Sequence, residues 1–91
     1  MIFEWDEAKS RANARDRFLP FDVAIVMFGG PTLEVVDARR DYGEARIKAV
    51  GEVGGLYLTR IYTQRAEARR IISLCFANRK ERDAHRAKNP G

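Results

Sequence analysis

The sequence predicts a small α+β protein in which N-terminal helices pack on a twisted antiparallel sheet and a further helix follows the sheet. Three observations favour this fold. The chain has 91 residues, which is the size of one small domain. Apolar residues recur at helical spacing in the first third of the chain, whereas apolar and polar residues alternate in its second half. Short turn-forming segments separate these stretches. We therefore expect residues 1–91 to form a single domain.

The chain is expected to begin with a short strand and a basic helix. Phe3 and Trp5 project to one side of the strand, where they can pin it to the edge of a sheet. Asp6 is suited to cap a helix that runs to about Phe18. Because this helix has little apolar surface beyond a few alanines and Phe18, we expect it to lie at the periphery.

A second helix is expected over residues 21–28, and Pro20 suits its first turn. Its apolar positions follow the spacing i, i+3, i+4 and i+7, which is typical of a core-packing face. These positions are Phe21, Ala24, Ile25 and Phe28. Gly29-Gly30-Pro31 ends the helix, residues 32–37 have strand character, and residues 38–43 form a charged connection.

Residues 44–76 predict three consecutive strands of an antiparallel meander. In residues 44–50 charged and apolar side chains alternate, as they do in a half-buried strand. Gly54-Gly55 tolerates the positive φ that a tight hairpin requires. Residues 56–64 and 68–76 are rich in aromatic and β-branched side chains, which favour strands. The meander is the element around which the rest of the chain is expected to be arranged.

The second part of the chain is strongly basic. Residues 1–59 contain 8 Lys/Arg and 10 Asp/Glu, whereas residues 60–91 contain 9 and 3. Asn78 is expected to cap a final helix over residues 79–88, which adds to this positive potential. Such a gradient favours a polyanion or an acidic protein surface as partner.

Other classes of protein fit the composition poorly. A lone Cys75 cannot form an internal disulfide, and one cysteine with one histidine cannot build a zinc site of the usual kind. We expect neither a metal site nor a cofactor. No apolar run approaches the roughly 20 residues of a membrane span, and the acidic first residues lack the basic region of a signal peptide. The expected location is the cytoplasm, with no membrane partner.

Several motifs, in order along the chain, resemble those of the BrnT toxins. They are Phe3-Glu4-Trp5-Asp6-Glu7-Ala8-Lys9, Asn13, Phe21, Phe28, Pro31, Gly43-Glu44-x-Arg46, Gly51, Tyr62-Thr63, Arg70-Ile71-Ile72-Ser73, Ala77-Asn78 and Glu81-Arg82. The resemblance implies a RelE-like fold and a toxin of a type II toxin-antitoxin system that cleaves RNA and halts translation. It implies a BrnA-like antitoxin with a ribbon-helix-helix part, through which the complex would contact operator DNA. The ribosome is a further candidate partner.

Cleavage of RNA without a metal needs a base, an acid, and cations that stabilise the charged transition state. Arg46 and Arg70 fall at positions that match the family's motifs, and their planar guanidinium groups can bind two phosphate oxygens at once. We expect the first and third strands of the meander to bring them toward one cleft, although ion pairs with neighbouring carboxylates are the alternative. The candidates for proton transfer are Glu44, Lys48, Tyr62 and His85, each of which also has a purely structural interpretation. The candidates for RNA binding are Arg60, Arg69, Arg79, Lys80 and Arg82.

The chain also departs from the family's pattern. Asp16-Arg17-Phe18 replaces the usual Lys-His-Gly after the first helix, and Tyr62 stands where a histidine is usual. Cys75 and Phe76 occupy positions that are usually basic. The alternative function is therefore a catalytically weak or inactive homologue that binds its antitoxin as a co-repressor module. A simple RNA-binding domain is a third hypothesis.

Overall fold

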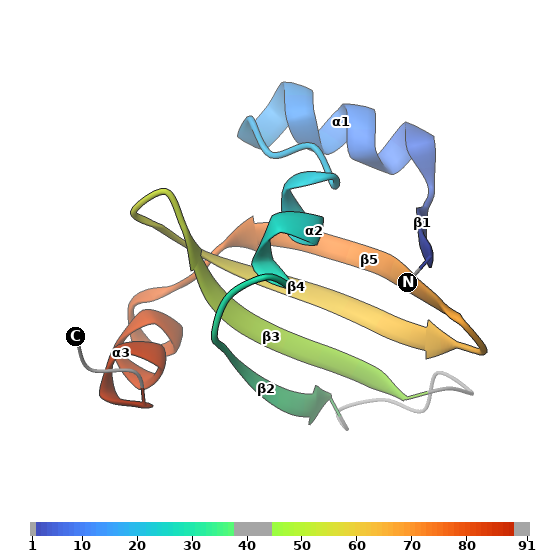
Figure 1. Cartoon of the computed structure of the whole chain (residues 1–91). Coiled ribbons are helices and arrows are strands. Elements are labelled where there is room, and N and C mark those ends of the chain that lie inside the picture. Colours follow the sequence, from blue (N-terminus) through green and yellow to red (C-terminus); the bar gives the residue numbers. More distant parts are fainter. Residues whose placement is uncertain (1, 38–44, 89–91) are drawn as a thin grey trace.

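The computed structural model describes residues 2–37 and 45–88, which form a mixed five-stranded sheet with three helices (Figure 1). The elements in chain order are β1 (Ile2–Trp5), α1 (Glu7–Arg17), α2 (Val23–Met27), β2 (Thr32–Asp37), β3 (Arg46–Val53), β4 (Leu56–Arg65), β5 (Ala68–Phe76) and α3 (Arg79–Lys88). The predicted α+β fold is confirmed, with the meander β3–β4–β5 in the middle of the sheet. In these two ranges no helix is long and apolar enough to cross a membrane.

The strands lie in the order β1-β5-β4-β3-β2. Four of them are antiparallel to their neighbours, as expected, but β1 pairs with β5 in parallel. Parallel neighbours require a long connection, and here the whole chain from α1 to β4 lies between them. The short strand of Phe3 and Trp5 therefore closes one edge of the sheet, and β2 forms the other edge.

Two of the sequence signals for turns and caps act as predicted. Asp6 accepts hydrogen bonds from the backbone of Ala8 and Lys9 at the start of α1. Gly54 and Gly55 have φ values of 57° and 84°, so both central residues of the β3–β4 turn are left-handed. β3 is described from Arg46 on, and the predicted first residue of this strand, Glu44, lies outside the described residues.

Helices α1 and α2 cover one face of the sheet, which we call the helix face (Figure 1). The hydrophobic core lies between these helices and the sheet. It consists of Leu19, Phe21, Ala24, Met27, Leu58, Tyr62, Ile71 and Leu74. Phe28 is partly buried and packs against this core. Phe21, Ala24 and Phe28 of the predicted apolar stripe thus face the sheet, but Ile25 is only half-buried and lies outside this core. The helix is also shorter than predicted, because it begins at Val23, after Pro20 and Phe21.

Helix α1 attaches to the rest of the chain mainly through polar groups. The Asn13 side chain donates hydrogen bonds to the carbonyl oxygens of Leu19, at 2.6 Å, and Leu74, at 2.9 Å. Phe18, which was expected to add apolar packing surface, is instead 85% exposed. The reason is that Phe18 occupies the left-handed position after the helix, with a φ of 60°, and its side chain points outward.

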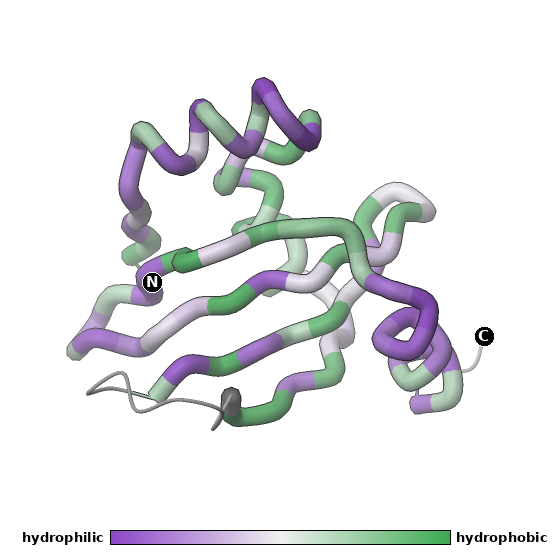
Figure 2. Tube along the Cα trace, turned by 180° about the vertical axis from the view of Figure 1, so that it is seen from behind, coloured by the Kyte–Doolittle hydropathy of each residue, from purple (hydrophilic) through white to green (hydrophobic). Residues whose placement is uncertain are grey.

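The opposite face of the sheet, which we call the open face, carries helix α3 only at one end (Figure 1). Figure 2 shows the molecule from behind, with polar and apolar residues alternating along the middle strands. Strand register and alternation assign Arg46, Lys48, Thr63 and Arg70 to the open face. The most concentrated set of predicted functional side chains therefore lies where the helices leave the sheet uncovered.

Candidate active site

Two arginines lie in one row across the open face, which we call the arginine row. Arg46 on β3 and Arg70 on β5 are both register partners of Thr63 on β4, and Arg70 is the partner of Glu4 on β1. The two arginines come from the first and third strands of the meander, as expected, and lie on either side of β4. Neighbouring strands are about 5 Å apart, so the two backbones are separated by about 10 Å. Long guanidinium side chains can converge on one phosphate across this distance.

The arginine row combines a buried floor with partly exposed cations. Thr63 is fully buried, and its hydroxyl donates a hydrogen bond to the Ala45 carbonyl oxygen at 2.9 Å. Arg46 is partly buried, and the side chain of Arg70 is 30% exposed. A ligand on the open face can therefore reach two partly buried arginines whose backbones the sheet holds on either side of β4.

Glu4 is a candidate that the sequence reasoning missed. Its carboxylate lies 3.9 Å from the Arg70 guanidinium, and its side chain is 41% exposed. The alternation of Phe3 and Trp5 toward the core already places Glu4 on the other face of the strand. What the sequence does not show is the parallel register that sets Glu4 beside Arg70.

Lys48 lies two residues from Arg46 on the same face, but it forms an ion pair with a residue of α3. Its ammonium forms an ion pair with Glu81, which also accepts hydrogen bonds from the Thr59 hydroxyl at 3.1 Å and the Asn78 backbone N–H at 2.9 Å. Burial alone would raise the pKa of Glu81, but the hydrogen bonds from Lys48, Asn78 and Thr59 outweigh it and lower that pKa. Glu81 is therefore a stable anion that neutralises Lys48 and ties α3 to the sheet.

Arg60 and Tyr62 lie on the helix face, away from the arginine row. Arg60 is 0% exposed, with its guanidinium 3.4 Å from Glu34, 3.3 Å from the Ala24 carbonyl oxygen and 3.2 Å from the centre of the Phe28 ring. Burial lowers the pKa of Arg60 to about 10. The Tyr62 hydroxyl donates to Glu34 at 3.0 Å, and burial together with this bond raises its pKa.

These contacts correct two expectations. RNA contact by Arg60 and proton transfer by Tyr62 do not fit the structure, because alternation along β4 turns both side chains into the core. Arg69 also lies on the helix face, where its guanidinium is 4.3 Å from the centre of the Phe28 ring. Arg69 is thus separated from Arg70 by the sheet itself.

His85 lies under α3, not in the arginine row. It is 5% exposed, its Nε2 is 3.2 Å from the Pro31 carbonyl oxygen, and its ring packs edge-on against Tyr57. His85 lies on the side of α3 that faces the sheet. Proton transfer to RNA by His85 does not fit this position.

The remaining predicted cations lie on α3. Arg79 and Lys80 are exposed, and Arg82 is partly buried. Asp83 lies 3.9 Å from Arg79 and 3.8 Å from Arg82, but such surface pairs contribute little and exchange readily with other anions. Within residues 2–37 and 45–88 there is no group of three acidic, histidine or cysteine side chains that could hold a metal ion.

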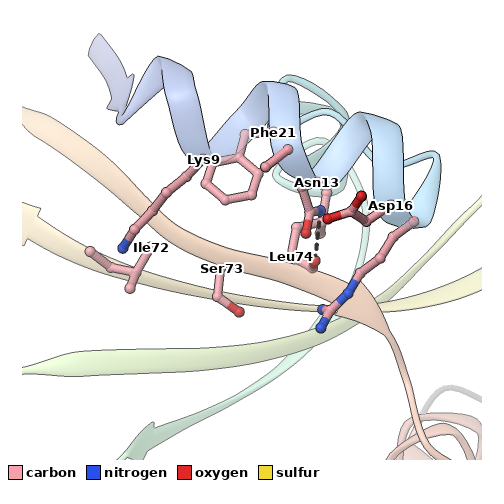
Figure 3. A pocket seen from close by; sticks show the side chains of 9 residues that line it. Lys9, Asn13, Asp16, Phe21, Ile72, Ser73 and Leu74 are labelled. Carbon is pink, nitrogen blue, oxygen red and sulfur yellow. Dashed lines mark hydrogen bonds between the residues drawn. The ribbon is translucent and has the colours of Figure 1, made fainter.

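A hollow of about 340 Å³ lies between α1 and β5, beyond the end of β1 (Figure 3). Its lining includes Lys9 and Arg17 from the helix and Ser73 from the strand. Figure 3 shows the Lys9 side chain extending from α1 toward Ile72. Ser73 follows Arg70 by three residues on β5, whereas Lys9 and Arg17 come from α1, which covers the helix face.

Comparison with known protein families gives a match over most of the chain. Residues 5–81 match the family described as the ribonuclease toxin, BrnT, of type II toxin-antitoxin systems. No curated protein matches the chain. The matched range includes both arginines of the row and the strand between them, and it covers most of the chain. The motifs, the α+β fold and this match agree, and the chain therefore belongs to the BrnT family of ribonuclease toxins of type II toxin-antitoxin systems.

Proposed function

We propose that this chain cleaves RNA on the open face of its sheet without a metal ion and thereby inhibits translation. One observation carries the proposal: the strand register sets Arg46 and Arg70 on the same face, on either side of Thr63. Family membership supplies the ribonuclease class, and the arginine row supplies a place for the scissile phosphate.

The chemistry follows from the charges in the row. In RNA cleavage the 2′-oxygen attacks phosphorus, the bond to the 5′-oxygen breaks, and a cyclic phosphate and a free 5′-hydroxyl result. Extra negative charge gathers on the phosphate oxygens during this step. Guanidinium groups stay charged at any relevant pH and bind two oxygens at once, so Arg46 and Arg70 stabilise that charge in place of a metal ion.

The proton transfers need a base on the same face. Glu4 pairs with Arg70 and is partly exposed, and in our proposal it accepts the proton of the 2′-hydroxyl. The leaving 5′-oxygen takes a proton from Lys48 or from water. Glu44 stays a candidate base from the sequence, and it lies outside the described residues.

Cations outside the arginine row bind the rest of the RNA in this proposal. Lys9 and Arg17 line the hollow next to β5, and Arg79 and Lys80 are exposed on α3. In the proposal these side chains bind flanking phosphates without reading the bases, so binding weakens steeply with salt. The partner that neutralises the toxin is a BrnA-like ribbon-helix-helix antitoxin, and the complex contacts operator DNA only through the antitoxin.

The test is incubation of RNA with purified protein in EDTA, beside the same experiment with Glu4→Gln. The proposal predicts cleavage in EDTA and a large loss of rate in the variant. Activity that appears only after a divalent metal is added contradicts the metal-free mechanism. Full activity of Glu4→Gln contradicts only the choice of base.

A second function has a specific observation in its favour. Tyr62 and His85 are both buried and hydrogen-bonded to other groups, and burial raises the pKa of the Cys75 thiol, which stands at a usually basic position. These three positions therefore offer no group for catalysis. This fits a homologue that cleaves RNA poorly and binds its antitoxin as a co-repressor module. Unimpaired growth on strong induction, together with intact antitoxin binding, would favour it over the ribonuclease.

A further inference from the structure

β2 (Thr32–Asp37) is an edge strand with unusual exposure. It is the last strand of the sheet in the part of the chain that is described, with β3 on one side only. Val35 is 53% exposed on the open face and Val36 is 65% exposed on the helix face. The strand contains neither lysine nor proline, the residues that commonly prevent edge strands from pairing. Such an edge is a template for another strand.

An apolar groove lies directly beside this edge. A hollow of about 260 Å³ on the open face separates α3 from β2 and β3, and most of its lining is apolar. The apolar lining residues are Leu33, Val35, Val50 and Ala84. Lys80 and the paired Lys48 and Glu81 border the groove. A side chain that extends from a strand paired with β2 would meet this groove on the open face.

The surroundings of the groove are basic. Helix α3 carries five cations and two carboxylates in ten residues. The cations are Arg79, Lys80, Arg82, Arg86 and Lys88. The ligand for this surface therefore combines apolar side chains with negative charge.

We propose that β2 and the adjoining groove bind an extended, acidic segment of the antitoxin. The segment pairs with the outer edge of β2, inserts apolar side chains beside Val35, and directs carboxylates toward α3. A polypeptide fits better than RNA, because only another backbone supplies the alternating N–H and C=O groups that a strand edge requires, and exposed valines offer nothing to a phosphate. This inference rests on the proposed toxin function for the identity of the partner.

The position of this edge connects antitoxin binding with inhibition. Val35 is the register partner of Lys48, and Asp37 is the partner of Arg46. A strand added beside β2 is separated from β3 by one strand, so its backbone lies about 10 Å from that of β3. Long acidic side chains of the segment can reach the Arg46 end of the arginine row, where they exclude RNA phosphate.

The experiment uses the full chain co-expressed with its antitoxin. Backbone hydrogen exchange is measured for the free chain and for the complex. Residues 33–36 are expected to gain protection in the complex. Protection elsewhere with no change in β2 would overturn the proposal.

A pair of variants provides the matched control. Val35→Asp places a like charge where the acidic segment binds, and we expect it to weaken antitoxin binding at least tenfold while RNA cleavage stays within threefold. Val26→Asp changes a valine of similar exposure, 61%, on α2, and binding is expected to stay within threefold. Equal weakening by both variants contradicts the proposal.

Other occupants of the edge give distinct results. A free chain that is dimeric, and that Val35→Asp makes monomeric, shows that a second copy covers β2. Protection of β2 by an RNA oligonucleotide in place of antitoxin shows that the edge belongs to the RNA surface. Either result overturns the antitoxin proposal. The cleavage assay is read separately, so loss of ribonuclease activity in the wild-type chain is not confused with either of them.

Discussion

Replacement of Arg70 by alanine separates catalysis from folding. The side chain is 30% exposed, and its ion pair with Glu4 spans 3.9 Å between partly exposed groups. Pairs of this kind contribute about 1 kcal/mol or less to stability. Arg70→Ala is therefore expected to fold, with a free energy of unfolding close to that of the wild-type chain.

The expected effect on cleavage is much larger. Removal of one preorganised donor that faces developing charge on an oxyanion costs about 3 kcal/mol of transition-state stabilisation, which is on the order of a hundredfold in rate. In the proposal Arg46 already binds the same phosphate, so the remaining arginine does not replace the missing contact. We expect the cleavage rate of Arg70→Ala to fall by about two orders of magnitude, with relief of growth arrest on induction.

The assay compares single-turnover cleavage of an RNA oligonucleotide by the wild-type chain, Arg70→Ala and Arg69→Ala. Arg69 is the matched control, because it is the preceding arginine on β5 but lies on the helix face against Phe28. Urea unfolding of all three proteins accompanies the rates. A rate for Arg70→Ala within threefold of the wild-type rate would refute the reasoning, and so would an equal loss in a folded Arg69→Ala.

Three further predictions concern stability. Arg60→Ala should lower the free energy of unfolding by about 3 kcal/mol in urea, because Arg60 is 0% exposed and packs on Phe28, and a loss below about 1 kcal/mol would contradict its structural role. Asn13→Ala should cost about 2 kcal/mol by the same measurement, because two carbonyl oxygens lose their donor, and an unchanged urea midpoint would contradict this. The pKa of Glu81 lies below its ordinary value of 4.5, so its stabilisation is complete above about pH 4.5 and is lost as the pH falls through the folded value. Thermal unfolding between about pH 3 and pH 7 should show this acid loss in the wild-type chain and a weaker one in Glu81→Gln, and equal pH profiles would contradict it.

Local patterns in the sequence predicted most elements of the fold. The spacing of Phe21, Ala24 and Phe28 identified the segment that packs on the core, and Gly54-Gly55 identified the tight hairpin. Asp6 and Asn78 marked the starts of two helices. These features depend on residues that are only a few positions apart, so local sequence patterns can predict them. The parallel pairing of β1 depends on a contact across the whole chain, which no local pattern reports.

The site was harder to predict because alternation alone does not say which face of a strand is buried. Along β4, Arg60 and Tyr62 alternate with Thr59, Ile61 and Thr63, and both sets contain apolar and polar side chains. Helix α2 decides the matter, because it covers the face that carries Arg60. On β3 the same alternation placed Arg46 correctly on the face opposite Ala49, since only one set there is charged.

His85 shows the same limit on a helix. A single histidine among charged residues is predicted to be exposed to solvent. In the structure α3 packs on β2 and β3, and His85 is buried against Tyr57. The helix has too few apolar residues for the sequence to indicate which of its sides faces the sheet. Its position is set by contacts with Pro31 and Lys48, which lie far away in the sequence.

The most direct test of the central claim is a structure of this chain with an RNA oligonucleotide whose 2′-hydroxyls are replaced so that it cannot be cleaved. The account predicts a phosphate over Thr63, within hydrogen-bond distance of the guanidinium groups of Arg46 and Arg70. RNA bound only along α1 or α3, with the arginine row unoccupied, would contradict it.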